Sequence, residues 1–351
     1  MASLAAFRAL IKTSLKSGKT LVYLGIGTAL TTILLAWALR DMSLTAVWQA
    51  FQQANWGWLG LGWLAYLLSY GVRARRSQTL MSATAKQGRF QTYLAATFVG
   101  FGASSILPGY AGEVIRAAIP ARLDKVPFEA VFGSIFAERI LDLGVVFLYL
   151  LLPIWSNALP AGHNLPLGWA GAAILLLWLC LLGLASQPQA LVRGVIQLCQ
   201  LLRLSRFQPQ LVSSLQHFLA GLGALRQPRL SAIALLETLL VWGLNAVTYW
   251  AGLLAFGLVA PAPAPGFLGA LFIQSSAALA VILPTTPGYI GAFEAGIRFA
   301  LGLYKLPIDL ILAYALALRV VMFIATPLIG LAIGVRLGLT KAELFALQRR
   351  R

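Results

Sequence analysis

Long apolar runs separated by short polar stretches make up most of the chain. Six of these runs are long enough to cross a bilayer as helices: 21–39, 56–72, 128–152, 167–185, 230–258 and 307–335. The runs are continuous and do not alternate between apolar and polar residues, which excludes a membrane β-barrel. The pattern therefore predicts an all-α polytopic membrane protein with six full spans.

Two further apolar segments, 91–122 and 266–305, are interrupted near their middles by proline, glycine and a carboxylate. The second contains the stretch LPTTPGYIGAFEAGIRF, from Leu283 to Phe299. Prolines and glycines end helices here, and irregular backbone inside a membrane is stable only when it is buried in protein or lines a wet cavity. Each segment therefore predicts two helices joined by a turn, a re-entrant helical hairpin.

Two polar segments predict amphipathic helices at the membrane surface. Segment 43–54 places Trp48 and Phe51 opposite its glutamines, and segment 186–229 carries five arginines among spaced leucine and valine residues. Because no linker rich in proline, glycine or serine divides the sequence, we expect one integral membrane domain over residues 1–351. Within it, 186–229 is expected to be cytoplasmic.

The basic residues give this pattern an orientation. The net charge is +17, from 27 Lys and Arg against 10 Asp and Glu, and most basic residues lie in short loops or at the ends of apolar runs. This distribution follows the positive-inside rule and argues against nucleic acid binding. We predict that four basic parts of the chain are cytoplasmic: the N-terminal arm, segments 73–89 and 186–229, and the tail. Two loops without Lys or Arg are predicted to lie outside, 153–166 and 259–266. We expect a multi-pass protein of the cell (inner or plasma) membrane, surrounded by lipid, with both termini in the cytoplasm.

The two hairpins share a motif. ILPGYAGEVIR begins at Ile106 and PGYIGAFEAGIR begins at Pro287, so that Pro-Gly-Tyr-x-Gly is followed by glutamate and arginine in both. The next predicted helix begins with a proline in each copy, and twelve residues later stand Arg139 and Arg319. The repeat units cover about 91–152 and 266–335.

The orientation places the two hairpins on opposite faces of the membrane. Segment 91–122 starts and ends on the cytoplasmic side, and segment 266–305 starts and ends outside. The same unit inserted from both sides is an inverted-topology repeat, and interrupted helices at matching places of such repeats are typical of the substrate site of alternating-access transporters.

Ionisable residues within or beside the apolar segments are the candidates for chemistry, because each costs about 2.5–3.5 kcal/mol at a helix centre. They could be buried salt bridges that fix each hairpin to the next helix, or they could line a polar chamber for a charged or zwitterionic headgroup. Asp142 and Glu237 are the weaker candidates. The candidate substrate-binding residues are Tyr110, Glu113, Arg116, Glu138, Arg139, Tyr289, Glu294, Arg298 and Arg319.

The sequence predicts no cofactor and no metal site. Its two cysteines and two histidines are scattered, so that a zinc site is not expected. The aspartates are also scattered, and the chain has no nucleotide-binding motif. We therefore expect that the protein is not an enzyme.

The stretches LPGYAGEVIR, ERILD and PTTPGYIGAFEAG resemble the lysylphosphatidylglycerol synthase transmembrane family, also called flippase-like membrane proteins, and the resemblance covers about 20–340. The best-studied relatives join this membrane unit to a soluble aminoacyl-transferase domain, for which about fifteen residues after 336 leave no room. The resemblance thus implies the lipid-translocating part of such proteins.

The family more often has Pro-Gly-Gly where Tyr289 stands here, and Tyr110 occupies the matching place of the first copy. The two tyrosines are expected to narrow the chamber or to donate hydroxyls to a headgroup.

The function expected from these features is translocation of a phospholipid or glycolipid headgroup between leaflets through a polar chamber at the bilayer midplane. Arg139 and Arg319 are expected to hold the opposing carboxylates. Alternatives are a secondary transporter for a small anionic or zwitterionic solute, an enzyme acting on lipid-linked substrates, and an accessory subunit of a lipid-modifying pathway.

Overall fold

The computed structural model describes residues 33, 43–84, 87–106, 111–160, 176, 178, 183, 187–201, 208–259, 264–282 and 287–337. These residues form helices and no strand, which confirms the all-α prediction. The helices are α3 (Leu44–Gln53), α4 (Trp56–Met81), α5 (Phe90–Ile106), α6 (Ala111–Leu123), α7 (Phe128–Trp155), α9 (Pro188–Leu201), α10 (Gln208–Gly221), α11 (Pro228–Ala255), α12 (Phe267–Ala280), α13 (Ala292–Gly302), α14 (Ile308–Arg319) and α15 (Thr326–Arg336), with short 3-10 segments η1 (Gly223–Arg226) and η2 (Pro287–Tyr289) and the π-helical η3 (Val320–Ala325).

Helices occupy four of the six predicted spans. They are α4, α7, α11 and the continuous run from α14 through η3 to α15. In the described part of the chain, Pro228–Ala255 and Ile308–Arg336 are long and apolar enough to cross a membrane. The predicted spans 21–39 and 167–185 lie outside the described residues, apart from four single positions.

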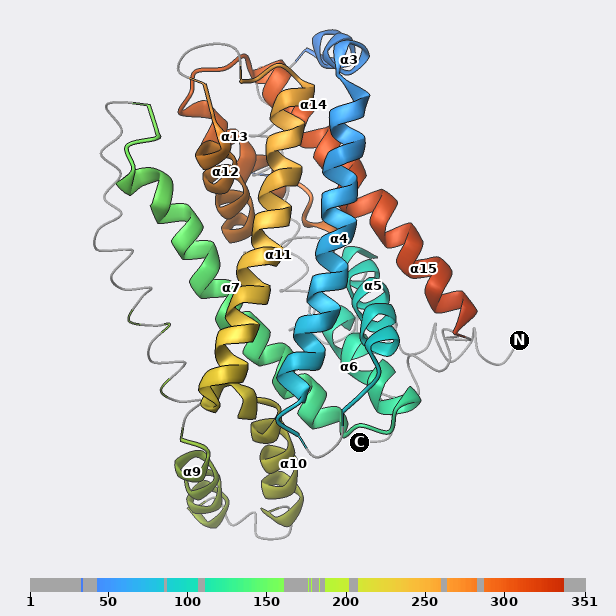
Figure 1. The fold of residues 1–351 in the computed structure, drawn as a ribbon, viewed down its shortest axis with the longest axis vertical. Coiled ribbons are helices and arrows are strands. Elements are labelled where there is room, and N and C mark those ends of the chain that lie inside the picture. Colours follow the sequence, from blue (N-terminus) through green and yellow to red (C-terminus); the bar gives the residue numbers. More distant parts are fainter. Residues whose placement is uncertain are drawn as a thin grey trace.

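Each interrupted segment forms a pair of helices that pack against each other, α5 with α6 and α12 with α13. Figure 1 shows the first pair in the half of the molecule that ends at α9 and α10, and the second pair in the half that ends at α3. The pairs meet where η2 packs against α5. A Cβ built on Gly288 would lie 3.4 Å from the carbonyl oxygen of Ser105, near the end of α5.

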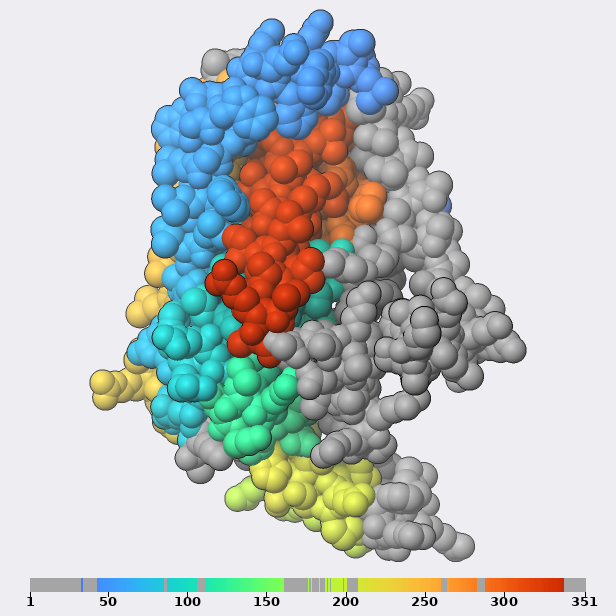
Figure 2. Space-filling model, turned by 90° about the vertical axis from the view of Figure 1, so that its right-hand side faces the viewer, coloured from blue at the N-terminus to red at the C-terminus, as the bar shows by residue number. Residues whose placement is uncertain are grey.

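Long helices form the centre of the bundle. α4 and α11 cross at Gly62, where Thr248 donates its hydroxyl to the Gly62 carbonyl at 2.9 Å. α15 packs on α5 so closely that a Cβ on Gly330 would lie 2.2 Å from the carbonyl oxygen of Phe98. Figure 2 shows α15 on the surface of the molecule, between α3 at one end and the α5–α6 pair.

The predicted amphipathic segments also form helices. In α3, Phe51 packs edge-to-face on Phe256 at 5.8 Å, while Trp48 points outward and is 66% exposed. Segment 186–229 contains α9, α10 and η1. α10 packs directly on α7, because a Cβ on Gly221 would lie 2.1 Å from the carbonyl oxygen of Ala130. Contact of these helices with a membrane surface stays a prediction.

One helix extends past its predicted span. The apolar run ends at residue 72, and α4 continues to Met81 with Arg73 and Arg76 buried. The cytoplasmic location of 73–89 stays a prediction. No proline or glycine lies between Arg73 and Met81, so nothing in the local sequence ends the helix. Other helices neutralise Arg76 there, and hydropathy does not detect such partners.

The last predicted span also differs from a plain helix, because η3 is π-helical and follows Arg319 directly. Pro327, near the start of α15, has no N–H to donate to the carbonyl four residues earlier. The neighbouring Thr326 donates its hydroxyl to the carbonyl of Val321 at 3.0 Å. Single π-helical turns of this kind occur often at functional sites.

Candidate functional site: a closed ring of buried ion pairs

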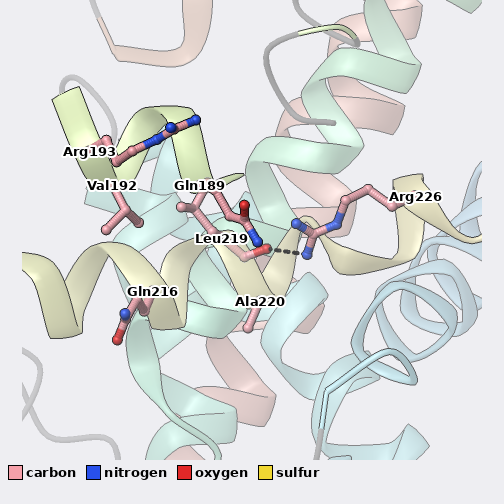
Figure 3. Close-up of a pocket in the computed structure, with 7 residues that line it drawn as sticks. All are labelled: Gln189, Val192, Arg193, Gln216, Leu219, Ala220 and Arg226. Carbon is pink, nitrogen blue, oxygen red and sulfur yellow. Dashed lines mark hydrogen bonds between the residues drawn. The ribbon is translucent and has the colours of Figure 1, made fainter. Parts of the chain in front are cut away.

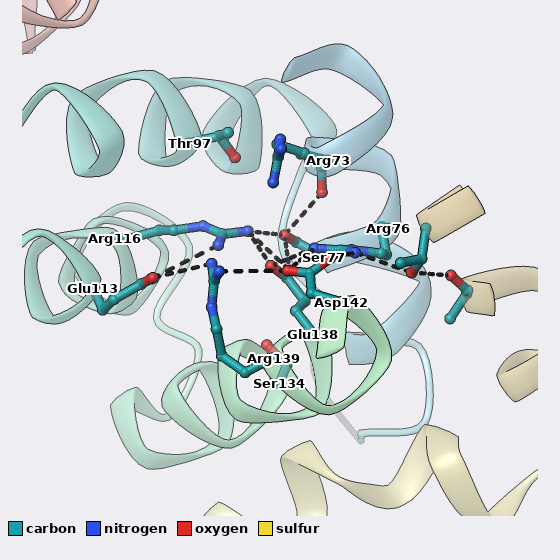
Figure 4. A network of polar contacts seen from close by, with 12 residues as sticks. Arg73, Arg76, Ser77, Thr97, Glu113, Arg116, Ser134, Glu138, Arg139 and Asp142 are labelled. Atoms are coloured by element: carbon teal, nitrogen blue, oxygen red, sulfur yellow. Dashed lines mark hydrogen bonds and ion pairs between the residues drawn. The ribbon is translucent and has the colours of Figure 1, made fainter. Parts of the chain in front are cut away.

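Six charged side chains from three helices form a closed ring in which arginines and carboxylates alternate (Figure 4). In order around the ring they are Arg76 of α4, Glu138 of α7, Arg116 and Glu113 of α6, and Arg139 and Asp142 of α7, which returns to Arg76. Three positive charges balance three negative charges, so the ring as a whole is neutral.

One side of the ring is deeply buried. Arg76 lies 2.6 Å from Asp142 and 3.1 Å from Glu138, and the side chains of Arg76 and Glu138 are 0% exposed. Glu138 also pairs with Arg116 at 2.7 Å. Ser77 donates its hydroxyl to Glu138 at 2.6 Å, so the carboxylate has a third partner. Buried charges are tolerated only when they are paired and hydrogen-bonded in this way.

The other side of the ring is accessible. Arg139 lies 3.0 Å from Glu113 and 3.4 Å from Asp142, and 41% of its side chain is exposed. Glu113 is 19% exposed and closes the ring to Arg116 through the longest contact, 3.8 Å. The Glu113–Arg139 pair is therefore the part of the ring that a ligand could reach.

Helix α11 supports the ring from outside. Thr238 accepts a hydrogen bond from Arg76 at 2.9 Å, and the indole N–H of Trp242 donates to Asp142 at 2.9 Å. The backbone carbonyl of Trp242 accepts a hydrogen bond from Gln274 of α12 at 3.1 Å. Trp242 thus connects the ring to the second hairpin.

The second hairpin has a simpler arrangement. Glu294 of α13 accepts hydrogen bonds from both Nε and Nη2 of Arg319 and from the backbone N–H of Gly291. Arg319 also donates to the carbonyls of Gly288 at 2.7 Å and Tyr289 at 3.3 Å. A single arginine therefore fixes both the turn and the start of α13.

Aromatic rings enclose this arginine. Its guanidinium lies 5.4 Å from the centre of the Phe293 ring and 5.3 Å from that of Phe323. Tyr289 packs edge-to-face on Phe323 at 5.9 Å and has a φ of 55°, in the left-handed region that favours glycine. This conformation explains why a glycine suits the position. Tyr289 is also close enough to Arg139 for an electrostatic interaction, which brings the two halves together at the accessible side of the ring.

The two repeats therefore pair matching residues. Glu113 with Arg139 in the first unit corresponds to Glu294 with Arg319 in the second. Each arginine holds the carboxylate of its own repeat unit, and not an opposing one as we expected. The units differ in that Arg116 joins the ring, whereas Arg298, at the matching place of the motif, is only half-buried. Tyr110 lies outside the described residues.

Sequence reasoning did not single out Arg76, Ser77 or Trp242, which contact the ring residues, and it placed Asp142, a member of the ring, among the weaker candidates. Asp142 carries two ion pairs and a hydrogen bond. The available signal was the spacing in α7, since Glu138 and Asp142 lie four residues apart and so share a helix face. Two carboxylates on one face of an apolar helix need basic side chains as partners. The hairpin does not supply enough of them, which indicates a further arginine or lysine on another helix.

A separate hollow of about 590 Å³ lies between α9, α10 and η1 (Figure 3). Its lining consists of Gln189, Val192, Arg193, Gln216, Leu219, Ala220 and Arg226. Arg226 is held there by a hydrogen bond to the Leu219 carbonyl at 3.2 Å. None of these residues belongs to the ring, and in the described part of the chain no group of three His, Cys, Asp or Glu could hold a metal ion.

The family model described as "Lysylphosphatidylglycerol synthase TM region" matches residues 24–330. The chain belongs to this family. Family membership and the helical fold together make it a membrane protein with a function connected to membrane lipids. A search of curated proteins found no match. The match spans all the ring residues and both hairpins, so the ring lies within the part of the chain that defines the family.

Proposed function

We propose that the protein translocates lipid headgroups between the two leaflets, and that it does so without an enzymatic step. The observation that carries this proposal is the ring of ion pairs, closed on one side and accessible at Glu113 and Arg139 on the other. A headgroup cannot cross hydrocarbon without losing its hydration, so it needs polar partners along the way. A paired ring offers both signs of charge at no net charge.

Exchange of partners gives these residues their proposed roles. When Arg139 releases Glu113, it can hold the anionic part of a headgroup, and Glu113 can accept a hydrogen bond from a hydroxyl or an ammonium group. Glu138 and Arg116 keep their buried partners and preserve the ring during the exchange. The acyl chains would stay in the surrounding lipid.

The second hairpin supplies the other wall of the proposed headgroup chamber. Arg319 makes four hydrogen bonds, two to Glu294 and two to backbone carbonyls, so we propose that this pair positions the turn. Tyr289 would then face the headgroup from the turn, close to Arg139. Two further contacts are proposed: Tyr110, in the Pro-Gly-Tyr part of the first motif, and Arg298, at the end of the second.

The proposed topology is the inverted repeat, with units about 91–152 and 266–335 entering from opposite faces and both termini in the cytoplasm of the cell membrane. The positions of the two helix pairs in Figure 1 support it, because they lie in opposite halves of the molecule. Alternating exposure of a midplane site is how such repeats work in transporters. The driving force would be an ion gradient or the asymmetry of the lipids themselves.

The test is a leaflet-resolved assay with the full chain in proteoliposomes. Fluorescent phospholipids and a fluorescent glycolipid are incorporated, and quenching of the outer leaflet is followed with and without a proton gradient. We expect accelerated exchange that falls at least about 10-fold in Glu113→Gln, because one charge-assisted contact is worth about 1.5–3 kcal/mol.

The matched control is Arg75→Gln. Arg75 lies on α4 beside the ring residue Arg76, but its side chain is 63% exposed, approaches Glu237 at 4.0 Å and donates to Gln78 at 2.9 Å, so that it contacts no ring residue. Exchange in this variant should equal the wild-type rate. Wild-type protein that accelerates exchange of no lipid class would refute the proposed function, and would favour a solute transporter or an accessory role.

A further inference from the structure

The hollow between α9, α10 and η1 combines positive charge with an apolar floor. Arg193 of α9 and Arg226 of η1 line it, together with the amide side chains of Gln189 and Gln216. In the view of Figure 3, Gln189 lies between the two arginines. The volume of about 590 Å³ falls within the range of small-molecule sites, about 300–1,000 Å³. The hollow therefore has the size and the polar groups of a ligand site.

The charge of the two arginines is not balanced within the hollow. Asp and Glu are absent from residues 143–236, and none of the described residues that line the hollow is acidic. Neither Arg193 nor Arg226 forms an ion pair in the described part of the chain. Arg226 is nevertheless held in place, because its Nη2 donates to the Leu219 carbonyl at 3.2 Å. A positioned guanidinium without an acidic partner is suited to binding an oxyanion.

The floor of the hollow is apolar and rests on the contact between α10 and α7. Leu219 is 3% exposed, and a Cβ on the nearby Gly221 would lie 2.1 Å from the Ala130 carbonyl oxygen of α7. Val192 of α9 faces the hollow from the other helix. Close packing fixes this floor, so it can cover hydrocarbon that a ligand carries next to its charge.

We propose that the hollow binds an anionic amphiphile, a molecule with an oxyanion beside a short apolar part. Arg193 and Arg226 would hold the oxyanion by charge-assisted hydrogen bonds. The apolar part would lie against Val192 and Leu219. No residue of the ring or of the hairpins takes part, so this site goes beyond the proposed function and does not depend on it.

The test measures binding to the full chain in nanodiscs of phosphatidylcholine, whose surface has no net charge. Isothermal titration uses hexyl phosphate, inorganic phosphate and hexanol, which represent the whole amphiphile, its anion and its apolar part. We expect hexyl phosphate to bind at least about 10-fold more tightly than inorganic phosphate, because the floor covers its chain, and hexanol not to compete with it. Val192→Ala should weaken binding of hexyl phosphate but not of inorganic phosphate.

Three arginine variants separate a built site from a diffuse positive surface. Arg193→Gln and Arg226→Gln should each weaken binding of hexyl phosphate at least about 10-fold, which is the loss of one charge-assisted contact. Arg229→Gln is the matched control, since Arg229 is exposed, lies three residues after Arg226 and does not line the hollow. It removes the same charge and should bind like wild type. Equal weakening in all three variants overturns the proposal.

Thermal unfolding guards against an effect of misfolding. Arg226→Gln loses the hydrogen bond to the Leu219 carbonyl, whereas Arg193→Gln loses no hydrogen bond within the described part of the chain. Without ligand, Arg193→Gln should therefore unfold at the wild-type temperature. Hexyl phosphate should raise the unfolding temperature of the wild type but not of Arg193→Gln. Unchanged affinity in Arg193→Gln overturns the proposal.

The anion could come from a lipid of the adjoining leaflet or from solution. Native mass spectrometry of protein released from nanodiscs that contain phosphatidylglycerol distinguishes these sources. Retained phosphatidylglycerol that is lost in Arg193→Gln but kept in Arg229→Gln assigns the hollow to a lipid. Retention that is equal in both variants assigns it to a soluble anion, and the titrations support the site in either case.

Discussion

Removing the charge of Glu138 is the sharpest perturbation of the ring. Its carboxylate is 0% exposed and pairs with Arg76 at 3.1 Å and Arg116 at 2.7 Å. In Glu138→Gln, Arg76 keeps its ion pair with Asp142 at 2.6 Å, but the ion pair left to Arg116 is the longer one with Glu113 at 3.8 Å, beside its hydrogen bond to Ser77. Breaking a buried ion pair by removing one partner typically destabilises a protein by about 3–5 kcal/mol, so we expect the free energy of unfolding of Glu138→Gln to fall by that amount.

The assay is unfolding of the purified protein in mixed micelles by titration with dodecyl sulfate, followed by helical circular dichroism. Glu129→Gln is the matched control, since Glu129 lies on the same helix, is half-buried and has no ion pair in the described part of the chain. It should change the free energy of unfolding by less than about 0.5 kcal/mol.

A double variant tests whether the ring acts as a unit. Combining Glu138→Gln with Arg116→Gln keeps the ring neutral. The double variant should therefore lose less unfolding free energy than the two single variants lose in sum, by about 0.5–3 kcal/mol. A Glu138→Gln protein within about 1 kcal/mol of wild type, or strictly additive costs, would refute the reasoning, because the pairs would then not be energetically linked.

Three further predictions concern other parts of the fold. Tyr289→Gly should be more stable than Tyr289→Ala by about 1 kcal/mol in the same unfolding assay, because both lose the contact with Phe323 but only glycine adopts the φ of 55° without strain; equal stabilities would contradict this. Gly221→Ala should lower the free energy of unfolding by about 1–3 kcal/mol, because the added Cβ would lie 2.1 Å from a backbone oxygen of α7 and would push α10 away from α7. Limited proteolysis should then cut α10 sooner than in the wild type. For Asp124, burial opposes ionisation, but hydrogen bonds from Arg89 outweigh it and hold the pKa of the carboxyl below its ordinary 3.8. The stability it contributes is therefore present above pH 3.8 and lost as the pH falls through the lower folded value, and Asp124→Asn should flatten the stability profile in that acid range. An unchanged profile would show that Asp124 titrates normally.

The helices were predictable because apolar length and Pro-Gly interruptions act locally. Segment 91–122 forms α5 and α6, and 266–305 forms α12, η2 and α13. The repeat also indicated which residues correspond, because Arg139 and Arg319 each follow a proline by twelve residues.

The ring could not be predicted, because closure depends on contacts between helices far apart in sequence. Arg76 and Asp142 are separated by 66 residues, and nothing in the local sequence shows that α4 and α7 meet there. Hydropathy placed Arg73 and Arg76 beyond the end of the apolar run, because charged residues end such a run on any hydropathy scale. The π-helical turn of η3 was also missed, because the stretch Val320–Ala325 is as apolar as the helices on either side of it.

The number of bridges in each half sets its mechanics. Helix α6 is joined to α7 by two bridges of opposite polarity, Arg116 to Glu138 and Glu113 to Arg139. Two attachment points oppose both sliding and rotation of α6 against α7, so we expect these two helices to move together. Among the described residues, helix α13 is joined to α14 by one ion pair, Glu294 to Arg319, and one ion pair constrains rotation less than two do. Any rocking of this protein is therefore expected to concentrate in the second half, with the first half as its fixed frame.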